Sequence, residues 1–134
     1  MPKDKAVPAA RAARGVRAQL RGLDAETVAC AALEADGWTV LGRRLRTEAG
    51  EVDIVAERCG LLAFVEVKSR DTLGQAAASI PPRQQARLLR AAEVLLGLHP
   101  EWGSAGVRFD VMVVDARGRV RRVADAFRSE VTPE

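Results

Sequence analysis

The sequence contains no tyrosine, only 4% aromatic residues and a single histidine. Alanine, leucine and valine must therefore build most of the core. No apolar run approaches the roughly 20 residues that span a bilayer, and no apolar segment follows the basic residues at the N-terminus, so we expect neither a membrane span nor a secretory signal. Cys30 and Cys59 stand apart, without a Cys-x-x-Cys pair or a neighbouring histidine. This usage argues against a disulfide framework or a zinc site and favours a reducing cytoplasm.

The length and composition are those of one globular domain with an uneven charge distribution. The 134 residues are 48% hydrophobic and 29% charged, with a net charge of +3. Residues 1–22 carry six Lys or Arg and one acid, a balance of +5, whereas the other 112 carry 15 bases and 17 acids, a balance of −2. We expect a basic arm over 1–14, a single domain over 15–128 and a tail over 129–134. The arm either attracts phosphate backbones or is simply a solvated, disordered terminus.

Apolar periodicity and turn residues predict the order α-β-β-β-α-β-β, an α/β fold in which helices pack on a mixed sheet of about five strands. The first helix is expected to begin near Gly15, or at Asp24 as its N-cap, and to end before Gly37. Two prolines, at 81 and 82, open a second helix that runs to about Leu98. The expected strands are 38–46, 51–57, 61–68, 107–114 and 119–123.

The most informative segment is the predicted hairpin 51–68, in which acidic residues alternate with apolar ones. Successive side chains of a strand point to opposite faces. A turn at Arg58-Cys59 would place Asp53 opposite Phe64 and diagonal to Glu66, within reach of a shared ion. Because ionised groups are costly to bury unless they are paired or metal-bound, the pair of acids is a candidate functional site.

The residue types of this hairpin suit phosphate chemistry. Asp53 and Glu66 provide the oxygen ligands that Mg²⁺ prefers, since Mg²⁺ takes one or two carboxylates plus waters and substrate phosphates. Lys68 is on the same face as Glu66 and could polarise a water or stabilise charge on a phosphate. A structural ion pair on a solvated face is the alternative, and spacing alone leaves both open.

Further candidates lie on the two helices. Glu26 is at the edge of the helix face that docks on the sheet, although an acid in a first helical turn is also favoured by the helix dipole. Gln84 and Gln85, near the start of the second helix, could hold a water or a phosphate, or could simply be solvated.

Several arginines are candidates for contacts with a nucleic-acid backbone, with a plain solvent-facing role as the alternative. They are Arg46, Arg70, Arg83, Arg87 and Arg90. Asp110 is expected to pair with Arg108 or Arg46 in a structural role.

Four motifs carry a resemblance to a known family. They are Gly22-Leu-Asp-Ala-Glu26, Gly50-Glu-Val-Asp-Ile-Val55, Phe64-Val-Glu-Val-Lys68-Ser-Arg70 and Arg108-Phe-Asp-Val111. In order and spacing they resemble the YraN family of small bacterial proteins, over roughly residues 15–128. That family is in turn similar to the restriction-endonuclease-like superfamily, which includes archaeal Holliday-junction resolvases. In that superfamily an Asp followed by Glu-x-Lys on the next strand holds Mg²⁺ and activates water for phosphodiester cleavage.

The resemblance implies a role for each matching residue. Asp53 and Glu66 would hold Mg²⁺, with Mn²⁺ as a substitute, and Lys68 would activate water. Glu26 would be a supporting acid and Gln84, or its neighbour Gln85, an accessory polar group. Two positions depart from the family pattern, because Arg44 stands where the family usually has Asn, and Gln84 where it often has Lys.

The function expected from these residues is a metal-dependent nuclease or nuclease-like nucleic-acid-binding protein, acting on DNA structure rather than on sequence. One alternative is a non-catalytic module that keeps the fold to bind nucleic acid or a protein. Another is a homodimer whose site is complete only after pairing. The sequence leaves the choice between DNA and RNA open.

Overall fold

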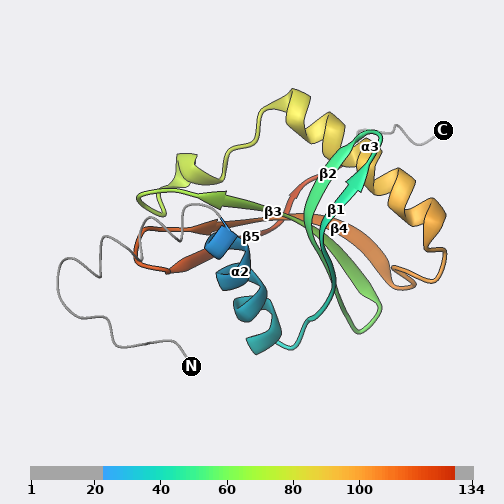
Figure 1. The fold of residues 1–134 in the computed structure, drawn as a ribbon, viewed down its shortest axis with the longest axis horizontal. Helices are drawn as coiled ribbons and strands as arrows, with labels where there is room; N and C mark the ends of the chain where they lie inside the picture. The colour runs from blue at the N-terminus through green and yellow to red at the C-terminus, as the bar shows by residue number, and fades with distance from the viewer. Residues whose placement is uncertain (1–22, 129–134) are drawn as a thin grey trace.

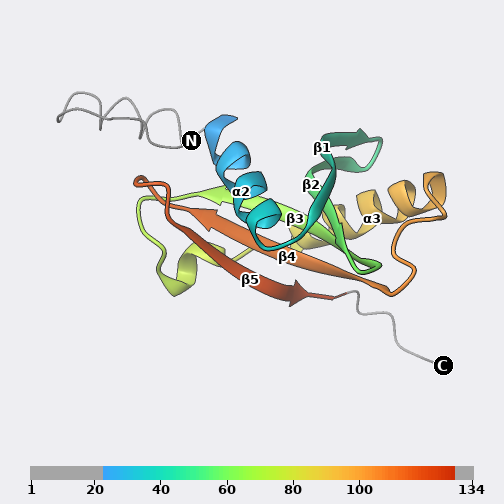
Figure 2. The ribbon, with the colours of Figure 1, turned by 90° about the horizontal axis from the view of Figure 1, so that it is seen from below.

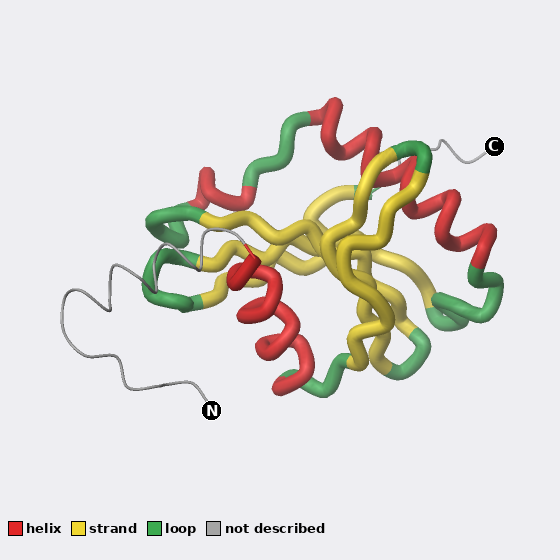
Figure 3. Tube along the Cα trace, viewed as in Figure 1, coloured by secondary structure: helices red, strands yellow, loops and turns green. Residues whose placement is uncertain are grey.

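The computed structural model describes residues 23–128, so the predicted arm 1–14, the residue Gly15 and the tail 129–134 lie outside the described residues. Within residues 23–128, eight elements follow one another (Figures 1 and 3). They are α2 (Leu23–Ala35), β1 (Thr39–Thr47), β2 (Gly50–Arg58), β3 (Leu61–Ser69), the short 3-10 helix η1 (Gln75–Ala78), α3 (Pro82–Leu98), β4 (Gly106–Val114) and β5 (Val120–Phe127). Apart from η1 this is the predicted order. No helix among residues 23–128 is long and apolar enough to cross a membrane.

The five strands form one sheet in the order β1-β2-β3-β4-β5. Neighbouring strands are antiparallel except for β3 and β4, which are parallel. A parallel pair needs a crossover connection, and here the connection contains η1 and α3 (Figure 1). The predicted mixed five-stranded sheet is therefore confirmed.

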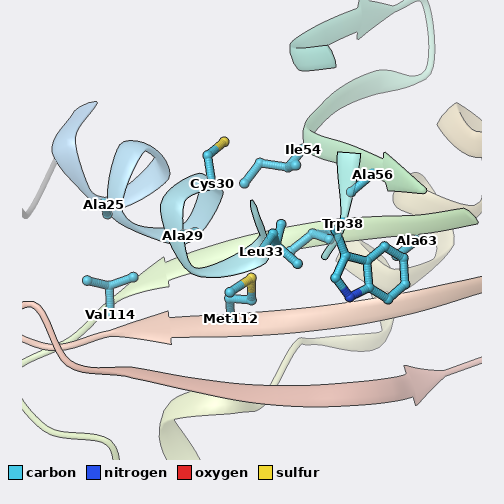
Figure 4. Close-up of a cluster of buried hydrophobic side chains, with 11 residues drawn as sticks. Ala25, Ala29, Cys30, Leu33, Trp38, Ile54, Ala56, Ala63, Met112 and Val114 are labelled. Atoms are coloured by element: carbon cyan, nitrogen blue, oxygen red, sulfur yellow. The ribbon is translucent and has the colours of Figure 1, made fainter. Parts of the chain in front are cut away.

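The two helices cover opposite faces of the sheet, and alternate strand residues divide between them. Ala63 and Val65 of β3 belong to the buried cluster under α2, whereas Leu62 and Phe64 belong to the cluster under α3. Figure 4 shows the first cluster, with Leu33 of α2 directed at the sheet. A sheet buried on both faces explains the nearly continuous apolar runs of β3 and β4.

Local residue chemistry explains where the helices begin and end. Pro82 occupies the first turn of α3, where a missing N–H has no cost. Gly37, with φ +88°, ends α2 in the left-handed conformation that favours glycine. The N–H of Trp38 then donates to the carbonyl of Leu33 at 3.0 Å. Asp24 is already inside α2, so it is not the N-cap.

The strand bounds differ from those predicted by at most one residue, except at the end of β5, and two of the differences have a physical cause. Trp38 precedes β1 instead of starting it, because the chain folds back and buries the indole, 3% exposed, in the cluster under α2 (Figure 4). The last strand was expected over 119–123 but continues to Phe127, which pairs with Phe109 beyond a bulge. Asp125 in this bulge has φ +56°, a conformation that Asp tolerates better than most residues.

The predicted register of the central hairpin was also wrong, by two residues. The turn is Cys59-Gly60, not Arg58-Cys59, and φ is +52° at Cys59 and +82° at Gly60. Two positive φ values are what a two-residue type I′ hairpin turn requires. The observed pairing runs from Arg58 with Leu61, beside the turn, to Ile54 with Val65. Because the shift is an even number, every side chain keeps its predicted face.

Candidate active site

The sheet divides at Asp53. Pairing between β2 and β3 ends at Ile54 and Val65, although β2 goes on pairing with β1 as far as Gly50. β3 meanwhile goes on pairing with β4 as far as its last residue. Figure 2 shows the β1–β2 hairpin rising out of the plane of the other strands. We call this division the fork.

The Asp53 side chain accepts a hydrogen bond from a backbone N–H of β3 that has no backbone partner on β2 at the fork. Its Oδ2 accepts a hydrogen bond from the N–H of Val67 at 2.8 Å, in place of a backbone carbonyl of β2. Continuing the observed register puts Asp53 level with Glu66, directly opposite and not diagonal as expected. The two carboxyl groups are close enough that the negative charge of Asp53 raises the pKa of Glu66.

Glu66, Lys68 and Gln84 complete the cluster from the α3 side of the sheet. The Gln84 Nε2 donates to Glu66 Oε2 at 2.8 Å, and the Lys68 Nζ donates to Gln84 Oε1 at 3.3 Å. Lys68 Nζ lies 3.8 Å from Glu66 Oε2, and the two side chains are only 13% and 12% exposed. An amide is both donor and acceptor, so Gln84 bridges an ammonium and a carboxylate. Asp53, Glu66, Lys68 and Gln84 are called the fork cluster below.

The two acids of the fork cluster hold their protons more tightly than usual. Burial, together with the negative charge of Asp53, raises the pKa of Glu66 to about 7, against the opposing effect of Lys68. Burial also raises the pKa of Asp53, by more than the hydrogen bond from Val67 lowers it. Two like charges at one buried place resist ionisation together, and a cation bound between them would relieve this repulsion.

The donor set fits a magnesium ion. Among residues 23–128 no group of three or more His, Cys, Asp or Glu side chains is arranged to hold a metal. Mg²⁺ commonly binds through one or two carboxylates and completes its shell with waters and substrate phosphates. Asp53 and Glu66 match that requirement, and the ammonium of Lys68 beside them suits an anionic substrate.

Glu26 lies close to the fork cluster but is held by other partners. Its charge contributes to the raised pKa of Asp53. Its Oε1 accepts a hydrogen bond from the Nε of Arg44 at 2.8 Å and lies 4.0 Å from the Nη2 of Arg43. Arg43 also donates to the hydroxyl of Thr27 at 3.2 Å. The first turn of α2 is thus joined to β1 by two consecutive arginines.

Arg44 is in a strained backbone conformation. Its φ is +51°, which costs roughly 1–2 kcal/mol for a residue with a Cβ. The Arg44 side chain is 43% exposed, and an ion pair so exposed contributes only about 0–1 kcal/mol. The pair with Glu26 therefore offsets at most part of the strain. Asn tolerates this conformation better than Arg does.

The predicted nucleic-acid-binding arginines lie along α3 and around the hairpin tip. Arg46 is 88% exposed, with its Nε 3.6 Å from the Oε2 of Glu51. Arg87 packs under the tip, since a Cβ built on Gly50 would lie 2.9 Å from its Cδ. Arg83, one turn before Arg87, is exposed. Arg70, which directly follows β3, is also exposed and donates to the carbonyl of Ser69 at 2.9 Å.

Gln84 and Gln85 have different positions. Gln84 joins the fork cluster, whereas the Nε2 of Gln85 donates to the carbonyl of Ile80 at 2.9 Å and supports the start of α3. Sequence reasoning could not separate them, because both lie near the start of the same helix.

Asp110 forms a network that was only partly expected. Its buried carboxylate accepts hydrogen bonds from Arg108 at 2.9 and 3.0 Å and from Arg122 at 3.2 Å. Arg46, the other expected partner, pairs with Glu51 instead. Arg122 was missed although it lies within the predicted last strand, because its approach to Asp110 depends on how β5 pairs with β4. The network ties β5 to β4 and is structural.

The fold and the fork cluster define a class: a mixed α/β protein with an Asp and a Glu-x-Lys on neighbouring strands of a forked sheet. The family model described as "Uncharacterised protein family UPF0102" matches residues 25–114. The chain belongs to this family, which is the YraN family recognised from its motifs.

Its relatives cover nearly the whole chain. A UPF0102 protein from Granulibacter bethesdensis is 62% identical over 115 residues, which is 86% of this chain and 73% of that protein. A UPF0102 protein from Bradyrhizobium diazoefficiens is 44% identical over 94% of this chain and 95% of its own. Among solved structures, an XisH family protein from Nostoc punctiforme is 21% identical, with a TM-score of 0.43, over 72% of this chain and 94% of that one. A similarity of that size says nothing about activity.

Proposed function

We propose that this protein is a metal-dependent nuclease that hydrolyses phosphodiester bonds in structured DNA. The observation that carries the proposal is the fork cluster. Two mostly buried acids and a lysine meet where the sheet divides, and burial, together with the negative charge of Asp53, raises the pKa of Glu66 to about 7. Strongly perturbed carboxyls with a specific charge partner are typical of functional sites.

Asp53 and Glu66 would hold Mg²⁺, with Mn²⁺ as a substitute, and a bound ion would neutralise charge on the phosphate and acidify a water. The chain's own residues do the rest. Gln84 fixes the Lys68 ammonium beside Glu66, where it can donate a hydrogen bond to the attacking water or to a phosphate oxygen. Partial burial removes competing water and strengthens both interactions.

The arginines favour recognition of DNA structure rather than of sequence. Arg46, Arg83 and Arg87 surround the hairpin tip and the first half of α3. Arginine contacts with phosphates position a nucleic acid but carry no sequence information. The isolated cysteines favour a reducing compartment, so we place the activity in the cytoplasm.

The test is cleavage of labelled branched, flapped, single-stranded and linear duplex DNA, with Mg²⁺ or Mn²⁺ and with a chelator. Wild type is compared with Asp53→Ala, Lys68→Ala and the control Glu93→Ala, which removes an exposed acid of α3 away from the fork cluster. We expect metal-dependent cleavage of a branched or flapped substrate by wild type and the control. Asp53→Ala and Lys68→Ala should not cleave, while Lys68→Ala still binds DNA. Loss of DNA binding in Lys68→Ala would count against its catalytic role.

One observation favours the non-catalytic alternative. Each polar side chain of the fork cluster already has a partner within the chain. If no DNA is cleaved and all four proteins bind it equally without metal, the protein is a binding module that keeps a nuclease-like fold. Sedimentation of the same samples shows whether it forms the homodimer that we also considered.

A further inference from the structure

A third acid, Glu26, is near the fork cluster but does not belong to it. It is close enough to Asp53 for its charge to disfavour ionisation there. Its carboxylate is nevertheless turned to β1, where Arg44 donates to it at 2.8 Å and Arg43 lies 4.0 Å away. The fork cluster therefore has two acids, with a third held beside it.

The way in which Arg44 reaches Glu26 is unusual. Consecutive side chains of a strand point to opposite faces, so two neighbouring arginines would not normally reach one helix turn. The left-handed backbone of Arg44 breaks this alternation and brings both guanidinium groups to the first turn of α2. A strained residue is a reason to look for a function, and here the strain serves this contact.

We propose that Arg44 is a positioning residue that withholds Glu26 from the fork cluster until a nucleic-acid phosphate takes its guanidinium. Arg43 and Arg44 are 42% and 43% exposed, so a phosphate can reach both. Guanidinium binds phosphate with two parallel hydrogen bonds. Once released, Glu26 would add its carboxylate to those of Asp53 and Glu66, so the metal site is completed only when substrate is bound. This inference rests on the proposed function.

The first experiment measures Mn²⁺ binding without DNA, by calorimetry on the full chain. Arg44→Gln removes the charge that holds Glu26, and we expect it to tighten Mn²⁺ binding by about fivefold or more, as for a typical coupling between sites. Adding Glu26→Gln to that variant should abolish the gain. Arg58→Gln is the matched control, because Arg58 is also 42% exposed and pairs with an acid, Asp36, at the other end of α2. It should leave Mn²⁺ affinity unchanged.

The second experiment follows the Arg44 Nε–H by NMR in metal-free protein with a chelator, so that no cleavage can occur. Adding a short DNA duplex should shift this resonance, as the guanidinium exchanges Glu26 for phosphate, and leave that of Arg58 in place. An unmoved Arg44 signal in DNA-bound protein would overturn the inference.

The outcomes separate the two proposals. If wild type binds Mn²⁺ and Arg44→Gln binds it equally or more weakly, Arg44 does not withhold Glu26, but the metal-dependent function stands. If none of the proteins binds Mn²⁺, the proposed function fails and the inference fails with it.

Discussion

The raised pKa of Glu66 predicts a specific pH dependence of stability in the metal-free protein. Its pKa moves from 4.5 to about 7 on folding. The folded state therefore keeps a proton that the unfolded chain loses, so stability falls as pH rises from about 4.5 to 7 and is constant above. Each unit of pKa shift corresponds to about 1.4 kcal/mol. The penalty at pH 8 is thus on the order of 3 kcal/mol, a large fraction of a small domain's stability.

Glu66→Gln isolates this effect. The new amide keeps the shape and its carbonyl can still accept the hydrogen bond from Gln84, but it cannot ionise. Urea unfolding with a chelator is measured at pH 5, 6, 7 and 8. The free energy of unfolding of the variant, relative to that of wild type, should increase as pH rises, by on the order of 3 kcal/mol across the range. Glu93→Gln, which changes an exposed acid of α3 away from the fork cluster, is the control and should follow wild type. Parallel pH profiles for wild type and Glu66→Gln would refute the reasoning, because burial and the charge of Asp53 would then not raise the pKa of Glu66.

Three other substitutions test separate parts of the structure. Gln84→Leu removes the bridge within the fork cluster and should lower the free energy of unfolding by about 1–3 kcal/mol, the usual cost of an unsatisfied buried partner. Thermal unfolding measures this loss. A loss of less than about 0.5 kcal/mol would contradict a stabilising role of the bridge. Burial alone would raise the pKa of Asp115, but hydrogen bonds from the backbone and guanidinium of Arg119 and from another amide lower it. Asp115→Asn should therefore destabilise at pH 7 and matter less as pH falls below 3.8 through the folded pKa, and an equal loss at pH 7 and pH 2 would argue against a charged role. Arg44→Gly loses the ion pair with Glu26 but relieves the left-handed strain, so stability should change by no more than about 1 kcal/mol; a larger loss in urea unfolding would show that the pair stabilises the fold strongly.

Only part of the candidate site was predictable. Asp53, Glu66 and Lys68 were found because strand alternation is local and survives a register shift of two residues. The shift itself was missed, because Cys59 gives no sign that it adopts the positive φ that its turn requires. The contact of Arg44 with Glu26 was missed for the same reason, since a left-handed residue inside a strand breaks the alternation on which the prediction depends.

The sequence by itself determined the element order, the mixed sheet and the family, because apolar periodicity and motif spacing are properties of neighbouring residues. The tertiary structure alone decided where β2 leaves β3, which glutamine reaches Glu66, and which partners hold Glu26. These contacts join residues 16–18 positions apart in the sequence, and they depend on how strands and helices meet. The local conformational preferences of residues carry no information about such tertiary contacts. The sequence therefore indicated the residue types of the site but not their geometry.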